Sequence, residues 1–188
     1  MVSIQTFLIP PQQSLPEVYS CMGTEELREL FVAVEHFESL YVGQSDEIPM
    51  KSNELNIAVI VQDTHQLLIG FEQWGLDLWG CYLSVLKIYI ESGFEYGEGI
   101  YGIDPKLICF KKIDNRLIEV TLKYDPLHVE KTISQFILEE RDFLQQLITG
   151  ASNFYAYMNS YNIHTSKKTL NFLSQTIELL KQTYSKEL

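Results

Sequence analysis

The chain has 188 residues, of which 46% are hydrophobic and 21% charged, and its 25 acidic against 14 basic side chains give a formal net charge of −11 at pH 7. This composition excludes a disordered chain, and the negative charge argues against binding to nucleic acid or to an anionic membrane, because phosphate groups need clusters of Lys and Arg. The imbalance lies in the first 104 residues, which hold 16 acidic and three basic side chains, whereas the remainder holds 9 and 11. We expect a single globular domain over residues 1–188, located in the cytoplasm.

An amphipathic helix is predicted after an extended or irregular, proline-rich opening. Apolar residues recur every three or four positions from Leu27 to Tyr41, and Thr24 is placed to cap the first turn. We expect the helix to end near Gly43. Its polar face would expose a stripe of four acidic side chains, namely Glu25, Glu29, Glu35 and Glu38.

Two β-hairpins are predicted in the middle of the chain. The first joins the β-branched run 55–61 to the apolar run 66–71. The second joins residues 106–112 to residues 116–124 through a turn at Asp114, and polar residues alternate with apolar ones along its second strand.

The segment between the hairpins is interpreted as a helix followed by a loop. The Tyr, Val and Ile content of residues 78–90 favours a strand, whereas their polar side chains fall at helical spacing. We prefer the helix, which Gly93 is placed to end. Three glycines follow within residues 94–105, which we interpret as a loop with turns at positive φ.

Helical spacing is longest in the C-terminal part, from Thr132 to Met158, where a bend is expected at Gly150. The charged residues 139–142 are placed on the solvated side of this helix, and a last helix begins near Ser166. The pattern therefore predicts an α+β fold, with one antiparallel sheet of about four to five strands, an N-terminal helix and two C-terminal helices, one of them long.

Residues 97–102 match the pattern G-x-G-x-x-G that many dinucleotide-binding proteins carry. That site needs a helix to open directly after the glycines, whereas Pro105 and a predicted strand follow here, and Glu95 and Glu98 would repel a phosphate. The same acidic residues could hold a hard cation, but they do not follow the spacing of an EF-hand loop. We expect neither a cofactor nor a metal.

The usual catalytic patterns are missing from the sequence. The three cysteines (Cys21, Cys81 and Cys109) are far apart and are interpreted as reduced structural thiols. The four histidines are scattered, and the nucleophile pattern G-x-S-x-G does not occur. No catalytic residue is assigned.

The most distinctive stretch, residues 72–80, combines both tryptophans of the chain with two carboxylates and two glycines. The carboxylates could form an acid/base pair beside aromatic rings, or the tryptophans could anchor a protein interface. The third interpretation is a turn between core elements.

We expect a non-enzymatic acidic binding protein, of the immunity or inhibitor type, that neutralises a basic toxin or a nuclease-like partner. The residues expected to contact this partner are the acidic stripe, the residues of the tryptophan stretch and two acids of the glycine-rich loop: Glu25, Glu29, Glu35, Glu38, Glu72, Trp74, Asp77, Trp79, Glu95 and Glu98.

Two alternatives remain open. The first is a hydrolase-like enzyme in which Glu72, Asp77 and Glu98 converge in one pocket and have raised pKa values. The second is a structural or regulatory subunit that forms a homodimer instead of a monomer, through the aromatic face of the long helix at Phe154, Tyr155, Tyr157 and Tyr161.

Overall fold

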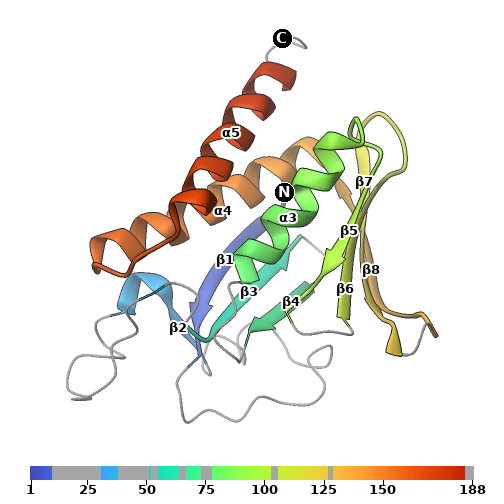
Figure 1. Ribbon diagram of the computed structural model, residues 1–188. Helices are drawn as coiled ribbons and strands as arrows, with labels where there is room; N and C mark the ends of the chain where they lie inside the picture. The colour runs from blue at the N-terminus through green and yellow to red at the C-terminus, as the bar shows by residue number, and fades with distance from the viewer. Residues whose placement is uncertain are drawn as a thin grey trace.

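The computed structural model contains two antiparallel sheets and three α-helices within the residues that it describes (Figure 1). These residues are 1–9, 31–37, 51, 55–63, 67–72, 78–102, 106–126 and 129–184. The predicted α+β class is confirmed.

The first sheet has the strand order β2-β1-β3-β4, and the second has the order β5-β6-β7-β8. The strands of the first sheet are β1 (Ser3–Leu8), β2 (Val32–Ala33), β3 (Ile57–Gln62) and β4 (Leu67–Glu72). Those of the second are β5 (Tyr96–Ile100), β6 (Lys106–Lys112), β7 (Leu117–Tyr124) and β8 (Lys131–Glu139). Both predicted hairpins are confirmed, but the prediction of one sheet with four to five strands is wrong. Four further strands come from other segments: β1 from the opening predicted as extended or irregular, β2 and β8 from predicted helices, and β5 from a predicted loop.

Helix α3 (Leu78–Glu91) packs against strands of both sheets, so its buried side chains form the centre of the core (Figure 1). It ends as the sequence predicts, with Gly93 at φ +78°. The amide of Phe94 donates to the carbonyl of Tyr89 at 2.9 Å, and the two rings meet edge to face with centroids 5.8 Å apart. Together with the bond from the Gly93 amide to the carbonyl of Ile90, this is a Schellman ending, which needs glycine at the left-handed position.

The glycine-rich segment forms strand β5, so the prediction of a loop with turns is wrong for residues 96–100. Gly97 pairs with Phe110 of β6 and is buried against α3. A Cβ atom at this position would lie 2.6 Å from the carbonyl oxygen of Val85 and 2.8 Å from the amide nitrogen of Tyr89. The glycine is therefore required by a close approach of strand and helix rather than by a turn. Gly102, in contrast, has a φ of +72°, and this left-handed backbone conformation favours glycine.

The long predicted helix begins at Glu140 rather than at Thr132, because residues 131–139 form β8. Phe136 pairs with Val120 and Leu138 with Ile118, so the pairing with β7 prevails over the helical spacing of the apolar residues. Helix α4 then runs from Glu140 to Ser160, and the Glu139 carboxylate accepts a hydrogen bond from the Asp142 amide at its N-terminus.

Gly150 lies inside α4, which continues through it from Glu140 to Ser160, and close packing explains the glycine. A Cβ atom there would lie 2.7 Å from the ring of Trp79, which is fully buried in α3. The indole N–H of Trp79 donates to the Thr6 hydroxyl of β1 at 2.9 Å. One side chain therefore joins α3, α4 and the first sheet.

The predicted N-terminal helix is wrong where the structure describes it. Residues 32–33 form β2, which pairs with β1, and η2 (Val34–His36) is a short 3-10 helix. Phe31, Val34 and Phe37 are buried at a spacing of three residues, which suits a 3-10 turn as well as an α-helix. The rest of that prediction lies outside the described residues.

Helix α5 (Lys167–Tyr184) begins as predicted, because the Ser166 hydroxyl accepts a hydrogen bond from the Thr169 amide at 3.1 Å. It contacts both α4 and α3. None of the described helices combines the length and the apolar composition that a membrane-spanning helix requires.

Candidate functional site

The ends of four strands lie side by side at one end of the first sheet. Leu8 pairs with Val32 on one side and with Ile57 on the other, and Ile57 pairs with Glu72. The amide of Ile9 also donates to the carbonyl of Asn56 at 2.9 Å. We call this end of the first sheet, where Leu8, Val32, Ile57 and Glu72 lie side by side, the Leu8 end.

Three acidic segments are attached at the Leu8 end. Residues 10–30 begin after Ile9 and return to the sheet directly before Val32, residues 38–54 rejoin it before β3, and residues 73–77 follow β4. These segments contain nine acidic residues and two basic ones, with Lys51 counted among the latter. The fold thus places both ends of segment 10–30, the end of segment 38–54 and the start of segment 73–77 at the Leu8 end, whereas segment 38–54 begins after Phe37, whose ring stacks on Tyr161.

The predicted partner residues fall into three groups. Glu25, Glu29, Glu38, Trp74 and Asp77 lie outside the described residues. Glu72 is the last residue of β4, at the Leu8 end, and the structure describes its backbone. The remaining four (Glu35, Trp79, Glu95 and Glu98) are described with their side chains.

Trp79 is a correction to the predicted site. Its side chain has 0% exposure and lies in the core, so it is not accessible to a partner. The interpretation of this residue as part of a core element is the right one. Glu35 and Glu95, in contrast, are exposed. Glu35 lines an open groove of about 730 Å³ between β1, η2 and α4, to which His36, Asn153 and Tyr157 also contribute.

Glu98 lies on the face of the second sheet opposite α3, in a cluster of polar side chains. Its carboxylate accepts hydrogen bonds from the Tyr96 hydroxyl at 2.7 Å and from Lys123 Nζ at 2.8 Å, and Lys123 also pairs with Glu130 at 3.2 Å. Partial burial opposes ionisation of Glu98, but these two donors outweigh it and lower its pKa. Burial and the neighbouring carboxylate raise the pKa of Tyr96.

This cluster bears on the enzymatic alternative, which requires raised pKa values for its carboxylates. The expectation is wrong for Glu98, whose charge is neutralised by Lys123. Cys109, on the same face, has 3% exposure, and burial raises the pKa of its thiol, which is typical of an inert structural cysteine. Among the residues that the structure describes, His, Cys, Asp and Glu form no group of three that could hold a metal ion.

Replacing Glu98 with glutamine is expected to lower the free energy of unfolding by about 0.5–1 kcal/mol at neutral pH, the magnitude of a partly exposed ion pair. Because the folded-state pKa lies below the ordinary value of 4.5, the wild-type advantage is present above that pH and is lost as the pH falls through the folded-state pKa. Urea denaturation at neutral pH and near pH 3 measures this difference. A difference that persists unchanged in acid would contradict the ion pair as its cause, and Glu91→Gln, at an exposed pair with Lys87, is the matched control.

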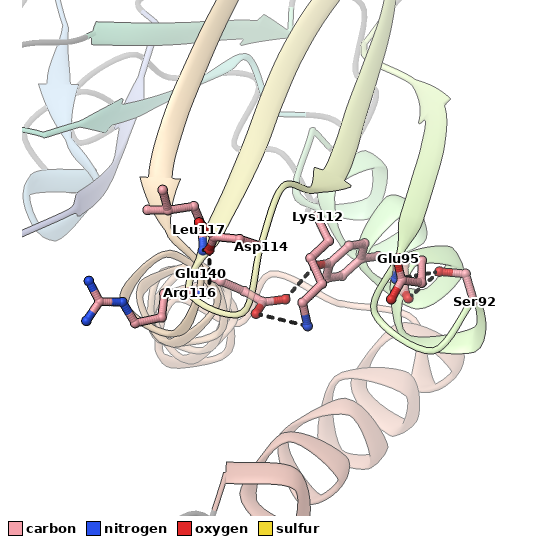
Figure 2. Close-up of polar contacts among 8 residues, drawn as sticks. Ser92, Glu95, Lys112, Asp114, Arg116, Leu117 and Glu140 are labelled. Carbon is pink, nitrogen blue, oxygen red and sulfur yellow. Dashed lines mark hydrogen bonds and ion pairs between the residues drawn. The ribbon is translucent and has the colours of Figure 1, made fainter.

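A second polar cluster is buried where α3, β6 and the start of α4 meet. The Glu140 side chain, in a residue with 5% exposure, accepts a hydrogen bond from the Tyr89 hydroxyl and lies 3.7 Å from Lys112 Nζ. Figure 2 shows the Glu140 and Lys112 side chains pointing toward each other. The amide of Glu140 donates to the carbonyl of Arg116 at 2.7 Å. The prediction that Glu140 belongs to a solvated side is therefore wrong. The contacts of Glu140 with Tyr89 and Lys112 join α4 to α3 and β6.

The aromatic face proposed for a homodimer is largely core. Phe154 and Tyr155 are buried, and the ring of Tyr161 stacks on Phe37 with centroids 4.5 Å apart. That dimer surface is therefore wrong for Phe154 and Tyr155. Comparison with known proteins finds no matching family model, no matching curated protein and no matching solved structure.

Proposed function

We propose that the chain is a non-enzymatic cytoplasmic binding protein of the immunity or inhibitor type, whose acidic segments at the Leu8 end occupy a basic surface of a toxin or nuclease-like protein. The observation that carries this proposal is the division of charge within the chain. The segments 10–30, 38–54 and 73–77 contain nine acidic and two basic side chains, whereas the other residues of the chain contain 16 acidic and 12 basic ones.

This division supports recognition by charge. The two sheets and their helices form a scaffold whose charges nearly cancel, and most of the excess charge belongs to segments that leave or rejoin it at the Leu8 end. A concentrated field of one sign steers a partner of the opposite sign and raises its association rate. The same concentration of negative charge repels nucleic acid, so the chain would bind a nuclease-like partner directly, at the partner's own basic surface.

The test uses the tagged chain to capture proteins from its native cell at low salt, followed by elution at high salt. We expect a basic protein to be retained and then released, because screening weakens contacts between exposed charges. The variant Glu25→Lys/Glu29→Lys/Glu38→Lys should lose this protein. The control Glu91→Lys/Glu130→Lys/Glu178→Lys makes the same change of charge at exposed scaffold positions and should keep it.

The captured partner is then assayed for its own activity, such as DNA cleavage, with and without the chain. Inhibition by the wild type and by the scaffold control, but not by the first variant, is the expected result. The proposal would be overturned if the captured protein stayed bound at high salt, or if both variants lost it to the same extent. The absence of any basic protein from the eluate would also overturn it.

A further inference from the structure

The groove between β1, η2 and α4, which we call the Glu35 groove, begins at the Leu8 end. It runs along β1 from Phe7 to Ser3, and η2 and the C-terminal half of α4 form its other walls (Figure 1). Phe31 and Val32, which directly follow the acidic segment 10–30, also line it. Its volume of about 730 Å³ lies in the range of ligand-binding pockets.

The walls of the Glu35 groove are held together by contacts within the fold. The Tyr161 hydroxyl, directly after α4, donates to the carbonyl of Glu35 at 3.3 Å, and the ring of Tyr161 stacks on Phe37. These contacts fix η2 against the end of α4. On the other side, the close packing of Gly150 against Trp79 and Ile4 fixes α4 against β1. A groove whose walls are fixed before binding loses less conformational entropy when it is filled.

The chemistry of the lining favours a cation. The titratable side chains that line the Glu35 groove are Glu35, His36 and Tyr157, and none of the described lining residues is a lysine or an arginine. Glu35 is exposed, and Asn153 and Tyr157 add an amide, a hydroxyl group and an aromatic ring from α4. A guanidinium group suits this set, because it donates in a fork to a carboxylate and stacks on aromatic rings.

We propose that the Glu35 groove takes an arginine side chain of the basic partner, with the guanidinium group against the Glu35 carboxylate and the Tyr157 ring. This inference rests on the proposed function, because the groove adjoins the acidic segments that recognise the partner. Arginines that fill pockets are common hot spots of protein interfaces, whereas exposed charges act chiefly on the association rate. The groove therefore holds the partner after the acidic segments have attracted it.

The first test is an NMR titration of the isotope-labelled chain with acetyl-arginine N-methylamide. The control probe is the corresponding citrulline compound, which has nearly the same shape and no charge. We expect the arginine probe to shift the amides of Gln5, Glu35 and Asn153, with a dissociation constant on the order of 1 mM, and the citrulline probe to bind at least about tenfold more weakly. Equal binding of the two probes, or shifts that lie away from the groove, would contradict the assignment.

Two variants test the charge and the space of the groove separately. Glu35→Gln removes the carboxylate and should raise the dissociation constant of the arginine probe by at least about tenfold. Asn153→Trp fills the groove from an exposed position of α4 and should abolish binding. The controls Glu178→Gln and Asn159→Trp make the same changes at exposed positions outside the groove and should bind the probe as the wild type does.

Circular dichroism confirms that each of these variants is folded. A wild-type chain that does not bind the arginine probe would overturn the inference. So would a Glu35→Gln variant that binds it as tightly as the wild type.

The same variants, assayed with the captured basic protein, allow this inference and the proposed function to fail separately. Glu35→Gln and Asn153→Trp should each weaken its binding by at least about tenfold. If that protein depends on Glu25, Glu29 and Glu38 but binds both groove variants as tightly as the wild type, the inference fails and the proposed function stands. If no basic protein is captured while the arginine probe still binds, the proposed function fails, and the assignment of the arginine to a partner fails with it.

Discussion

Replacing Gly97 with alanine is expected to destabilise the fold by about 3 kcal/mol, although most changes from glycine to alanine at extended positions stabilise proteins slightly. The added Cβ would lie 2.6 Å from the Val85 carbonyl oxygen, 2.8 Å from the Tyr89 amide nitrogen and 2.9 Å from the Tyr89 Cβ. Two of these atoms belong to the helical backbone of α3, which has no alternative rotamer. Strand β5 and α3 would have to separate, and the tightly packed core around Tyr89 would separate with them.

Gly99→Ala is the matched comparison for this prediction, because it lies on the same strand and faces the same helix. Its Cβ would meet the Val85 Cγ2 methyl at 2.9 Å, a side-chain atom that can be removed. We expect a loss of about 1 kcal/mol, and we expect Val85→Ala to relieve part of the Gly99→Ala loss while leaving the Gly97→Ala loss unchanged. Urea denaturation of the single and double variants measures both couplings. A Gly97→Ala protein as stable as the wild type would show that the strand and the helix are not in this close contact.

The glycine-rich segment shows where the sequence was and was not sufficient. A strand follows the pattern G-x-G-x-x-G, as the sequence predicts, in place of the helix that a dinucleotide site needs. The reason for its glycines was nevertheless misassigned, since sequence spacing reports backbone freedom and close packing with the same residue type. The distance between Gly97 and Val85 is a tertiary fact, and two residues twelve positions apart give no local signal of it.

The boundary between β8 and α4 was missed for a related reason. Ile133, Phe136 and Ile137 satisfy helical spacing, yet Phe136 faces the core and Ile137 is exposed, which is the alternation of a strand. The β-branched Thr132 and Ile133 were the signal that could have found it. In contrast, the end of α3 at Gly93 and the start of α5 at Ser166 were predicted correctly, because helix caps are local interactions between neighbours in the sequence.

The candidate site was predictable in its charge and not in its geometry. The sequence alone places the acidic excess in the first 104 residues, but the strand order that brings Leu8, Val32, Ile57 and Glu72 together is set by long-range pairing. Trp79 illustrates the opposite error. A tryptophan can anchor an interface or fill a core equally well. Trp79 is placed in the core by its contacts with Thr6 and Gly150, which are distant from it in the sequence.

Replacing Glu140 with alanine is the second change with a large expected effect, about 3 kcal/mol of destabilisation. The Glu140 carboxylate is almost fully buried, accepts a hydrogen bond from the Tyr89 hydroxyl and forms an ion pair with Lys112. Its removal takes away an acceptor from a buried hydroxyl group and an opposing charge from a lysine that is 25% exposed. The carboxylate also lies in the first turn of α4, where the helix dipole favours a negative charge. Glu140→Gln, which keeps an oxygen acceptor and loses the charge, should cost about half as much.

The two partners of Glu140 are not expected to contribute equally. Lys112 retains contact with water, which can replace part of the lost interaction, whereas the Tyr89 side chain has no exposure and its hydroxyl cannot be solvated without opening the core. Double-mutant cycles separate the contributions, with Tyr89→Phe and Lys112→Met each combined with Glu140→Ala. We expect a coupling of about 2 kcal/mol with Tyr89 and less than about 1 kcal/mol with Lys112. A coupling energy larger with Lys112 than with Tyr89 would mean that the carboxylate acts chiefly as a charge. A loss of stability below about 0.5 kcal/mol in Glu140→Ala would mean that the cluster does not join α3, β6 and α4 as these contacts imply.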